Sequence, residues 1–97
     1  MARFTTRVEL HIEEDEDRSE VYDILHEAME DEGFARTIKD SNGKTLKLPD
    51  AEYNYEGVIT IGEVLAKAKS AATTTEHESE ILVTEAIHRK WHGLKKR

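Results

Sequence analysis

The residues of this sequence that could do chemistry begin with Arg7 and His11, which lie in a segment that alternates polar and apolar side chains from residue 3 to 12. Such alternation predicts a half-buried strand, and Arg7 and His11 then share its polar face. Cleavage of RNA without a metal needs a base for the 2′-hydroxyl, an acid for the leaving oxygen and a cation for the phosphorane. Histidine serves as acid or base near neutral pH. Arg7 and His11 are therefore the predicted catalytic residues.

The other histidines give weaker signals. His26 lies near Asp23 in an acidic segment and is a second, weaker candidate for the same chemistry. His88 and His92 have the i, i+4 spacing that a helix needs to hold a metal. Gly93 follows them, however, and neither an HExxH motif nor an aspartate pair accompanies them. We therefore expect no metal and no cofactor.

Charge is strongly segregated along the chain, whose net charge is -7. Twelve acids and one base, Arg18, lie between Glu9 and Glu32, whereas the last nine residues hold five lysines and arginines and no acid. This acidity disfavours a general binder of duplex DNA, which needs a basic footprint. The acidic run from Glu13 to Asp17 lacks the alternating ligands and central glycine of a calcium loop. Its ordinary interpretation is a solvated acidic region, with the basic end as a loose tail.

Apolar spacing predicts six elements in the order β-α-β-β-α-β. They begin with a strand over 3–12 and a helix from a cap at Asp17 or Ser19 to Gly33. Two strands joined by a type I′ turn at Asn42-Gly43 follow, and then a helix opened by the capping box Thr60–Glu63 and ending near 73–75. The last element is a strand over 79–86, which is apolar on both faces and hence central or covered. This order predicts an α+β, ferredoxin-like sandwich with a four-stranded antiparallel sheet and two helices on one face. Residues 1–87 are expected to form this single domain, and 88–97 a basic C-terminal tail in which Trp91 and Leu94 can dock back.

The segment LPDAEYNYEG, Leu48 to Gly57, changes the parity of its apolar positions. A bulge at Pro49-Asp50 would explain the change, because proline cannot donate to a strand ladder. Tyr53 and Tyr55 would then return to the core face used by Leu46 and Leu48. The opposite face of this strand is acidic, which is unlike an RNA-binding sheet.

Several stretches together resemble a known family: ARFTTRVELH, LHEAMEDEGF, LPDAEYNYEG, EVLAKAKSAA and ILVTEA, with Trp91 and Leu94. They resemble small proteins of phages and bacteria grouped with the GhoS family, whose namesake is an endoribonuclease antitoxin that cleaves the messenger of its membrane toxin. The resemblance implies a ferredoxin-like fold, similar to that of small CRISPR-associated nucleases and often dimeric. Those nucleases carry a metal-binding aspartate at the end of the first strand. Here that position lies around His11 to Glu14, and Asp15 lies beyond the strand, which disfavours metal catalysis.

The resulting prediction is a GhoS-like RNA-interacting protein of the toxin–antitoxin type, a metal-independent endoribonuclease that acts on single-stranded RNA through Arg7 and His11. The alternative is a non-catalytic acidic phage protein that binds and inhibits a basic host defence or nucleic-acid enzyme. A third is a homodimer module in which the acidic helix of one copy meets the basic tail of the other. A homodimer is expected in any case. Because no apolar run approaches the ~20 residues of a membrane span, a cytoplasmic location without membrane contact is expected.

Overall fold

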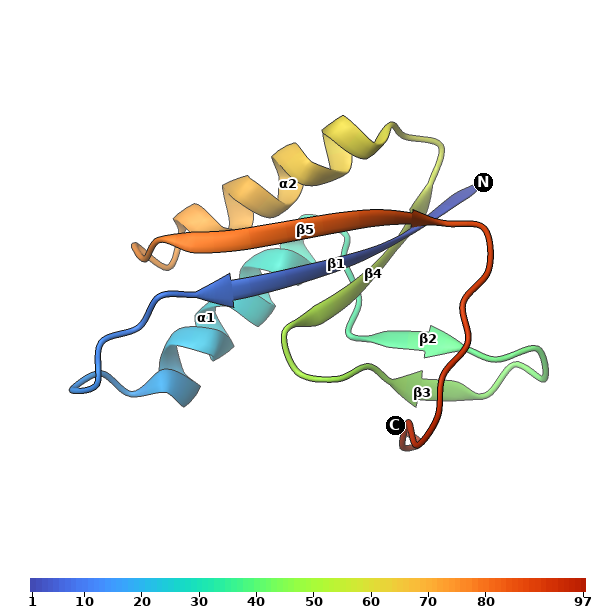
Figure 1. The fold of residues 1–97 in the computed structure, drawn as a ribbon, viewed down its shortest axis with the longest axis horizontal. Coiled ribbons are helices and arrows are strands. Elements are labelled where there is room, and N and C mark those ends of the chain that lie inside the picture. Colours follow the sequence, from blue (N-terminus) through green and yellow to red (C-terminus); the bar gives the residue numbers. More distant parts are fainter.

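The computed structural model describes residues 1–97 as an α+β fold with two helices (Figure 1). The elements in chain order are β1 (Ala2–Leu10), α1 (Arg18–Asp31), β2 (Thr37–Lys39), β3 (Thr45–Lys47), β4 (Glu52–Gly57), α2 (Ile61–Thr73) and β5 (Ser79–Ala86). The main sheet is antiparallel in the order β4-β1-β5, and β2 and β3 form a separate antiparallel hairpin. Both helices pack on one face of the main sheet, and its other face is open.

The main sheet has three strands, so the predicted four-stranded sheet is wrong. The backbone of the segment expected to form its second strand pairs with β4 only at the bridge between Ala35 and Asn54. It then leaves the sheet to form the hairpin. The break after β3 lies at Pro49–Ala51, because proline has no N–H to donate and Ala51 adopts a φ of 66°. The chain from Thr45 to Gly57 is thus two strands in two sheets, rather than one bulged strand.

Of the two positions predicted for the last strand, central or covered, the central one is wrong, because β5 lies at an edge and β1 is central. The side of β5 that faces away from the helices is open, and Leu82 on that side is 65% exposed. The apolar run at 81–83 therefore marks a strand covered on one face only.

The local signals at the element ends are confirmed, with one exception. Asp17 caps α1 by accepting the N–H of Glu20 at 3.2 Å, and both bonds of the capping box at Thr60 are present. The hairpin is confirmed, but a type I′ turn needs two residues with positive φ. Only Gly43 has one, at 81°, and the Asp40 carboxylate instead accepts two backbone N–H groups of the turn.

The core lies between the main sheet and the two helices. Its fully buried side chains include Phe4, Val8, Leu25, Met29, Tyr53 and Val64. Tyr53 and Tyr55 pack into this core, as predicted. Leu46 and Leu48 do not share it: they form a second cluster with Ile38, against which Leu94 packs. The alternation of apolar residues predicts that the two tyrosines and the two leucines share one face. The structure separates them, because the chain passes from one sheet to the other between Leu48 and Tyr53.

The basic tail is docked onto the hairpin. Lys47 N–H donates to the carbonyl of Lys95 at 2.8 Å, and Arg97 N–H donates to that of Thr45 at 3.3 Å. Residues 95–97 thus run along β3, and Figure 1 shows the tail passing from the end of β5 to the hairpin. Leu94 docks as predicted, whereas Trp91 remains 41% exposed. The interpretation of this segment as a loose tail is wrong, because its backbone and Leu94 are both engaged.

Thr6 on β1 offers a test of the core. Its side chain is fully buried and its hydroxyl has no hydrogen-bond partner. A buried unpaired hydroxyl costs about 1–3 kcal/mol, and valine has the same shape. Thr6→Val is therefore expected to raise the free energy of unfolding by about 1 kcal/mol in urea titrations. Thr84→Val, at an exposed threonine of β5, is the control and should give no such gain. A less stable Thr6→Val variant would contradict this account of the core.

Candidate functional site

Arg7 lies on the open face of β1, as predicted, and His11 follows directly after the last residue of β1, but the structure does not bring the two together. They are four positions apart, which places their Cα atoms about 13 Å from each other along the strand. They line different surface depressions, Arg7 beside Leu82 and His11 beside Glu78.

His11 is also engaged with acids. Its Nε2 lies 3.2 Å from a carboxylate oxygen of Glu80, and its Nδ1 lies 3.8 Å from Glu78. The hydrogen bond to Glu80 is the main cause that raises the pKa of His11 above 6.5. A raised pKa makes a histidine a poorer base at neutral pH, because less of it is then in the neutral form. The geometry therefore supports the Arg7–His11 pair only weakly.

The strongest cluster of chemical groups surrounds His26 instead. A depression of about 480 Å³ lies beside α1 and is lined by Arg18, Ser19, Tyr22, Asp23, His26, Arg36 and Asp50. We refer to it as the His26 depression. The first five of these residues come from α1, where Arg18, Tyr22 and His26 follow one another at i, i+4 spacing and so share a face. The other two come from the segments before β2 and after β3, where the chain enters and leaves the hairpin.

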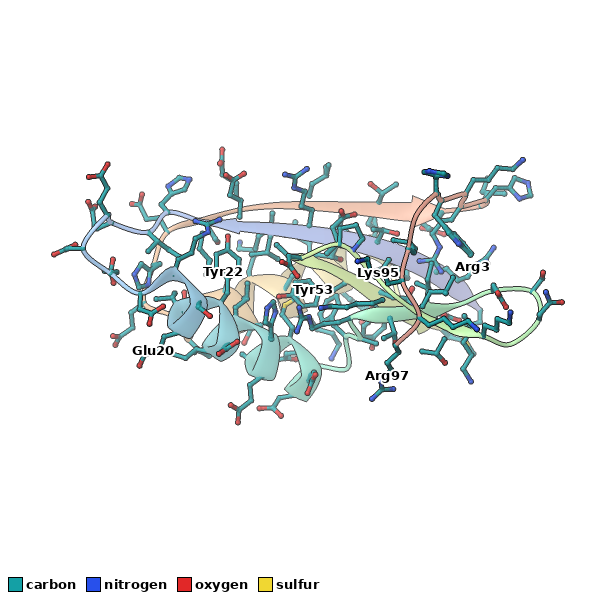
Figure 2. All side chains as sticks on the ribbon, turned by 90° about the horizontal axis from the view of Figure 1, so that it is seen from below. Arg3, Glu20, Tyr22, Tyr53, Lys95 and Arg97 are labelled. Carbon is teal, nitrogen blue, oxygen red and sulfur yellow. The ribbon has the colours of Figure 1, made fainter.

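The His26 ring is held by a buried partner on the sheet. Its Nδ1 lies 2.6 Å from the hydroxyl of Tyr53, whose side chain is fully buried, and Figure 2 shows Tyr22 and Tyr53 between α1 and the sheet. A tyrosine hydroxyl can donate or accept. When Nδ1–H donates to Tyr53, the lone pair of Nε2 is left to take a proton. Burial, and then the charge of Arg36, lower the pKa of His26 below 6.5. His26 is therefore neutral at pH 7, and in the tautomer that donates from Nδ1 it can act as a base at Nε2.

Two guanidinium groups flank this base. Arg36 lies 3.4 Å from the carboxylate of Asp50, and its side chain is 29% exposed, so its charge reaches the depression. Arg18 lies over the ring of Tyr22, with 4.8 Å between the guanidinium carbon and the ring centroid. The Tyr22 hydroxyl accepts the N–H of Leu10 at 3.0 Å and keeps its own proton for donation. A base, a proton donor, two cations and two carboxylates, those of Asp23 and Asp50, thus line one depression.

Sequence reasoning ranked His26 below His11 because its partners are distant in the chain. Tyr53 is 27 residues away, and its bond to His26 depends on how β4 packs under α1. The i, i+4 series of Arg18, Tyr22 and His26 is the one signal in the sequence that could have raised its rank.

The other candidates acquire no ligand geometry. Residues 88–92 form no helix, so His88 and His92 do not take up helical i, i+4 positions. No group of three or more histidine or acidic side chains is arranged to hold a metal ion. Within the acidic run, Asp17 caps α1, and Glu16 bonds to His77 at 2.7 Å.

His77 provides a pH-dependent test of how this acidic loop is held. Its Nδ1 lies 2.6 Å from the carbonyl of Thr75 and its Nε2 2.7 Å from the Glu16 carboxylate, and both of these groups only accept. The ring therefore donates twice and is protonated, and these bonds raise its pKa above 6.5. The stability that His77 contributes is thus fully present below pH 6.5 and is lost as the pH rises through the folded-state pKa.

Glu16→Gln is expected to lower the pKa of His77 in an NMR titration, because the anion is removed. Glu13→Gln is the matched control, because Glu13 lines the same depression as His77 without bonding to it. A wild-type pKa of His77 at or below 6.5 would contradict the double-donor geometry.

The His26 depression borders a second one at Arg36. This neighbour, of about 490 Å³, is lined by Glu30, Phe34, Ala35, Arg36, Thr37, Lys47 and Arg97. Three cations and one acid face it, and Figure 2 shows Arg97 at the surface, pointing away from the body. An anion bound in the His26 depression would therefore have a cationic neighbourhood on the side of the hairpin.

Neither helix is long and apolar enough to cross a membrane. Comparison of the chain with family models, with curated proteins and with solved structures found no match. The resemblance to the GhoS family therefore stays a prediction, and the function is argued from the geometry of the His26 depression.

Proposed function

We propose that this protein is a GhoS-like, metal-independent endoribonuclease that acts on single-stranded RNA at the His26 depression. The observation that carries the proposal is the position of His26, fixed by Tyr53 at 2.6 Å, with Arg36 in the same depression. The element order and the two helices on one face also support a ferredoxin-like description, in which the second strand is reduced to the Ala35–Asn54 bridge. A cytoplasmic, antitoxin-type role and a homodimeric state belong to the same proposal.

The groups in the depression can be assigned to a complete cleavage step. His26 Nε2 takes the proton of the RNA 2′-hydroxyl, and the 2′-oxygen attacks the adjacent phosphorus. Arg36 stabilises the charge on the phosphorane. The bond from phosphorus to the 5′-oxygen breaks, and this oxygen takes the proton of Tyr22. Arg18 and the N–H of Leu10 stabilise the phenolate. The products are a 2′,3′-cyclic phosphate and a 5′-hydroxyl, and proton return from His26 to Tyr22 resets the site.

The test is incubation of the purified protein with a mixed pool of single-stranded RNA in the presence of a chelator. We expect cleavage that leaves 2′,3′-cyclic phosphate ends. Arg7→Ala and His11→Ala, assayed in parallel, test the site predicted from sequence. Cleavage that both variants retain and that His26→Gln loses supports the His26 depression. If cleavage is lost only in the Arg7 or His11 variant, the active site is the one predicted from sequence rather than the His26 depression. If the wild type does not cleave RNA, the proposed nuclease activity is wrong.

The pH dependence separates the two histidines. A base must be neutral to act, so the rate is expected to rise with pH through a limb set by the pKa of the base. For His26 that limb lies below pH 6.5, and for His11 it would lie above pH 6.5, because their pKa values shift in opposite directions. Rates of cleavage of one oligonucleotide across a pH series measure the limb. A midpoint above 6.5 would contradict His26 as the base.

A second candidate function is supported by the outer face of α1. The exposed acids there include Glu20, Asp23, Glu27, Glu30 and Asp31, and none of them forms an ion pair. Such a face suits binding and inhibition of a basic nucleic-acid enzyme. Pull-down from a host lysate should then recover a basic protein, less of it as salt rises. A recovery that does not change with salt would exclude this function.

A further inference from the structure

The tail lies along the two-stranded hairpin and extends it by one bridge, and the two faces of this small layer differ. The bridge between Leu46 and Lys96 fixes the register of the tail against β3. Lys47 consequently lies opposite Lys95, and Thr45 opposite Arg97. The pairing of β2 with β3 adds Thr37 and Lys39 to these rows.

One face of this layer is therefore cationic. Its two rows across the strands read Thr37–Lys47–Lys95 and Lys39–Thr45–Arg97. The opposite face carries Ile38, Leu46 and Leu94, which pack together, and also the exposed Lys96 opposite Leu46. All four cations of the first face are exposed, and no acid stands in either row. We refer to these six residues as the cationic face.

The cations of this face have no anionic partner within the protein. None of the four takes part in an ion pair. The nearby acids are otherwise occupied or few: Asp40 bonds to the turn, Asp50 pairs with Arg36, and Glu30 alone lines the adjoining depression. Like charges directly opposite each other in a strand pair are destabilising. The Lys47–Lys95 pair is thus a cost that a bound polyanion would offset.

We propose that the cationic face binds the backbone of a single-stranded RNA. Lysine and arginine side chains bind nucleic acid by displacing counterions from its phosphates. The face meets the His26 depression through Arg36, which lines that depression as well as the one shared with Lys47 and Arg97. An RNA chain bound on the cationic face would therefore extend into the His26 depression and place one of its phosphates beside His26. The assignment of RNA as the occupant rests on the proposed function.

The test measures RNA binding in a background that cannot cleave. A fluorescein-labelled oligouridylate is titrated with His26→Gln protein, and anisotropy gives the affinity at several salt concentrations. The change is Lys47→Glu or Arg97→Glu. Lys47→Glu places a glutamate opposite Lys95, which is a favourable pair, so the fold should persist. Lys69→Glu is the matched control, because Lys69 is an exposed cation of α2 with the same change of charge. The single tryptophan, Trp91 in the tail, gives a second readout by fluorescence.

We expect Lys47→Glu and Arg97→Glu each to weaken binding by about tenfold or more, and to lower the slope of log affinity against log salt by about 0.7 for each phosphate that is no longer neutralised. Lys69→Glu should change neither. Equal affinities for all variants would overturn the cationic face, as would equal binding of a polyaspartate peptide, which would assign the face to an acidic protein.

The experiments distinguish failure of the proposed nuclease activity from failure of the proposed RNA-binding face. Weakened RNA binding by the Lys47 and Arg97 variants of a protein that cleaves no RNA would leave the cationic face in place without the nuclease. Cleavage with an unchanged KM in Lys47→Glu would leave the nuclease without the cationic face.

Discussion

Replacing His26 with glutamine is expected to slow RNA cleavage by about 10²–10⁴-fold, because a positioned general base contributes that much to the rate. This corresponds to about 3–5 kcal/mol of transition-state stabilisation. Glutamine can still bond to Tyr53, so the effect is expected to fall on the chemistry rather than on the fold. Single-turnover cleavage of a labelled RNA oligonucleotide, with far-UV circular dichroism to check folding, makes the measurement.

His11→Gln is the matched control, because it makes the same change on the same protein at the site predicted from sequence. It should leave the rate unchanged within about twofold if His26 is the base. Arg36→Gln should lower the rate as well, since Arg36 is the cation assigned to the phosphorane. Cleavage by His26→Gln at the wild-type rate would remove His26 from the mechanism.

Replacing Tyr53 with alanine is expected to destabilise the protein by about 3–5 kcal/mol, the range for truncation of a buried aromatic side chain. Tyr53 is fully buried, the centre of its ring lies 6.4 Å from that of Phe34, and its hydroxyl holds His26. A small domain has only about 5–15 kcal/mol of stability in total. Urea unfolding followed by circular dichroism should therefore show a transition at much lower urea.

Tyr53→Phe separates the two roles of this residue. The ring remains in the core, so the loss of stability is expected to be only about 1 kcal/mol, the net worth of one hydrogen bond. His26 loses the group that fixes its ring, so cleavage should slow, although by less than in His26→Gln. A Tyr53→Ala variant within about 1 kcal/mol of the wild type would contradict the central place given to Tyr53 in the core.

The sequence predicts the elements well where the signal is local. The caps at Asp17 and Thr60, the hairpin around Asn42-Gly43 and both helices are confirmed, because each depends on groups within a few residues of one another. Strand membership is predicted poorly. Which sheet a strand joins depends on its pairing with distant segments, and the short strands β2 and β3 bury their apolar residues away from the main core.

The candidate site shows the same contrast between features set by neighbours in the chain and features set by distant residues. The polar face of β1, which carries Arg7 and His11, is predicted by alternation alone, yet the acid that bonds to His11 is Glu80, 69 positions later in the chain. The value of His26 depends on Tyr53 beneath it and on Arg36 beside it. No spacing rule relates these three residues.

The amino-acid sequence by itself determined the α+β class, the helices with their caps, and the segregation of charge into an acidic first third and a basic end. Those features depend on composition and on neighbours along the chain. Only the tertiary structure decided that the main sheet stops at three strands, that the basic tail pairs with β3, and that Lys47 meets Lys95. The physical reason is that backbone pairing and burial join residues regardless of their separation in sequence. The same reason places His26, rather than His11, in a depression with Tyr22 and two arginines, beside the carboxylates of Asp23 and Asp50.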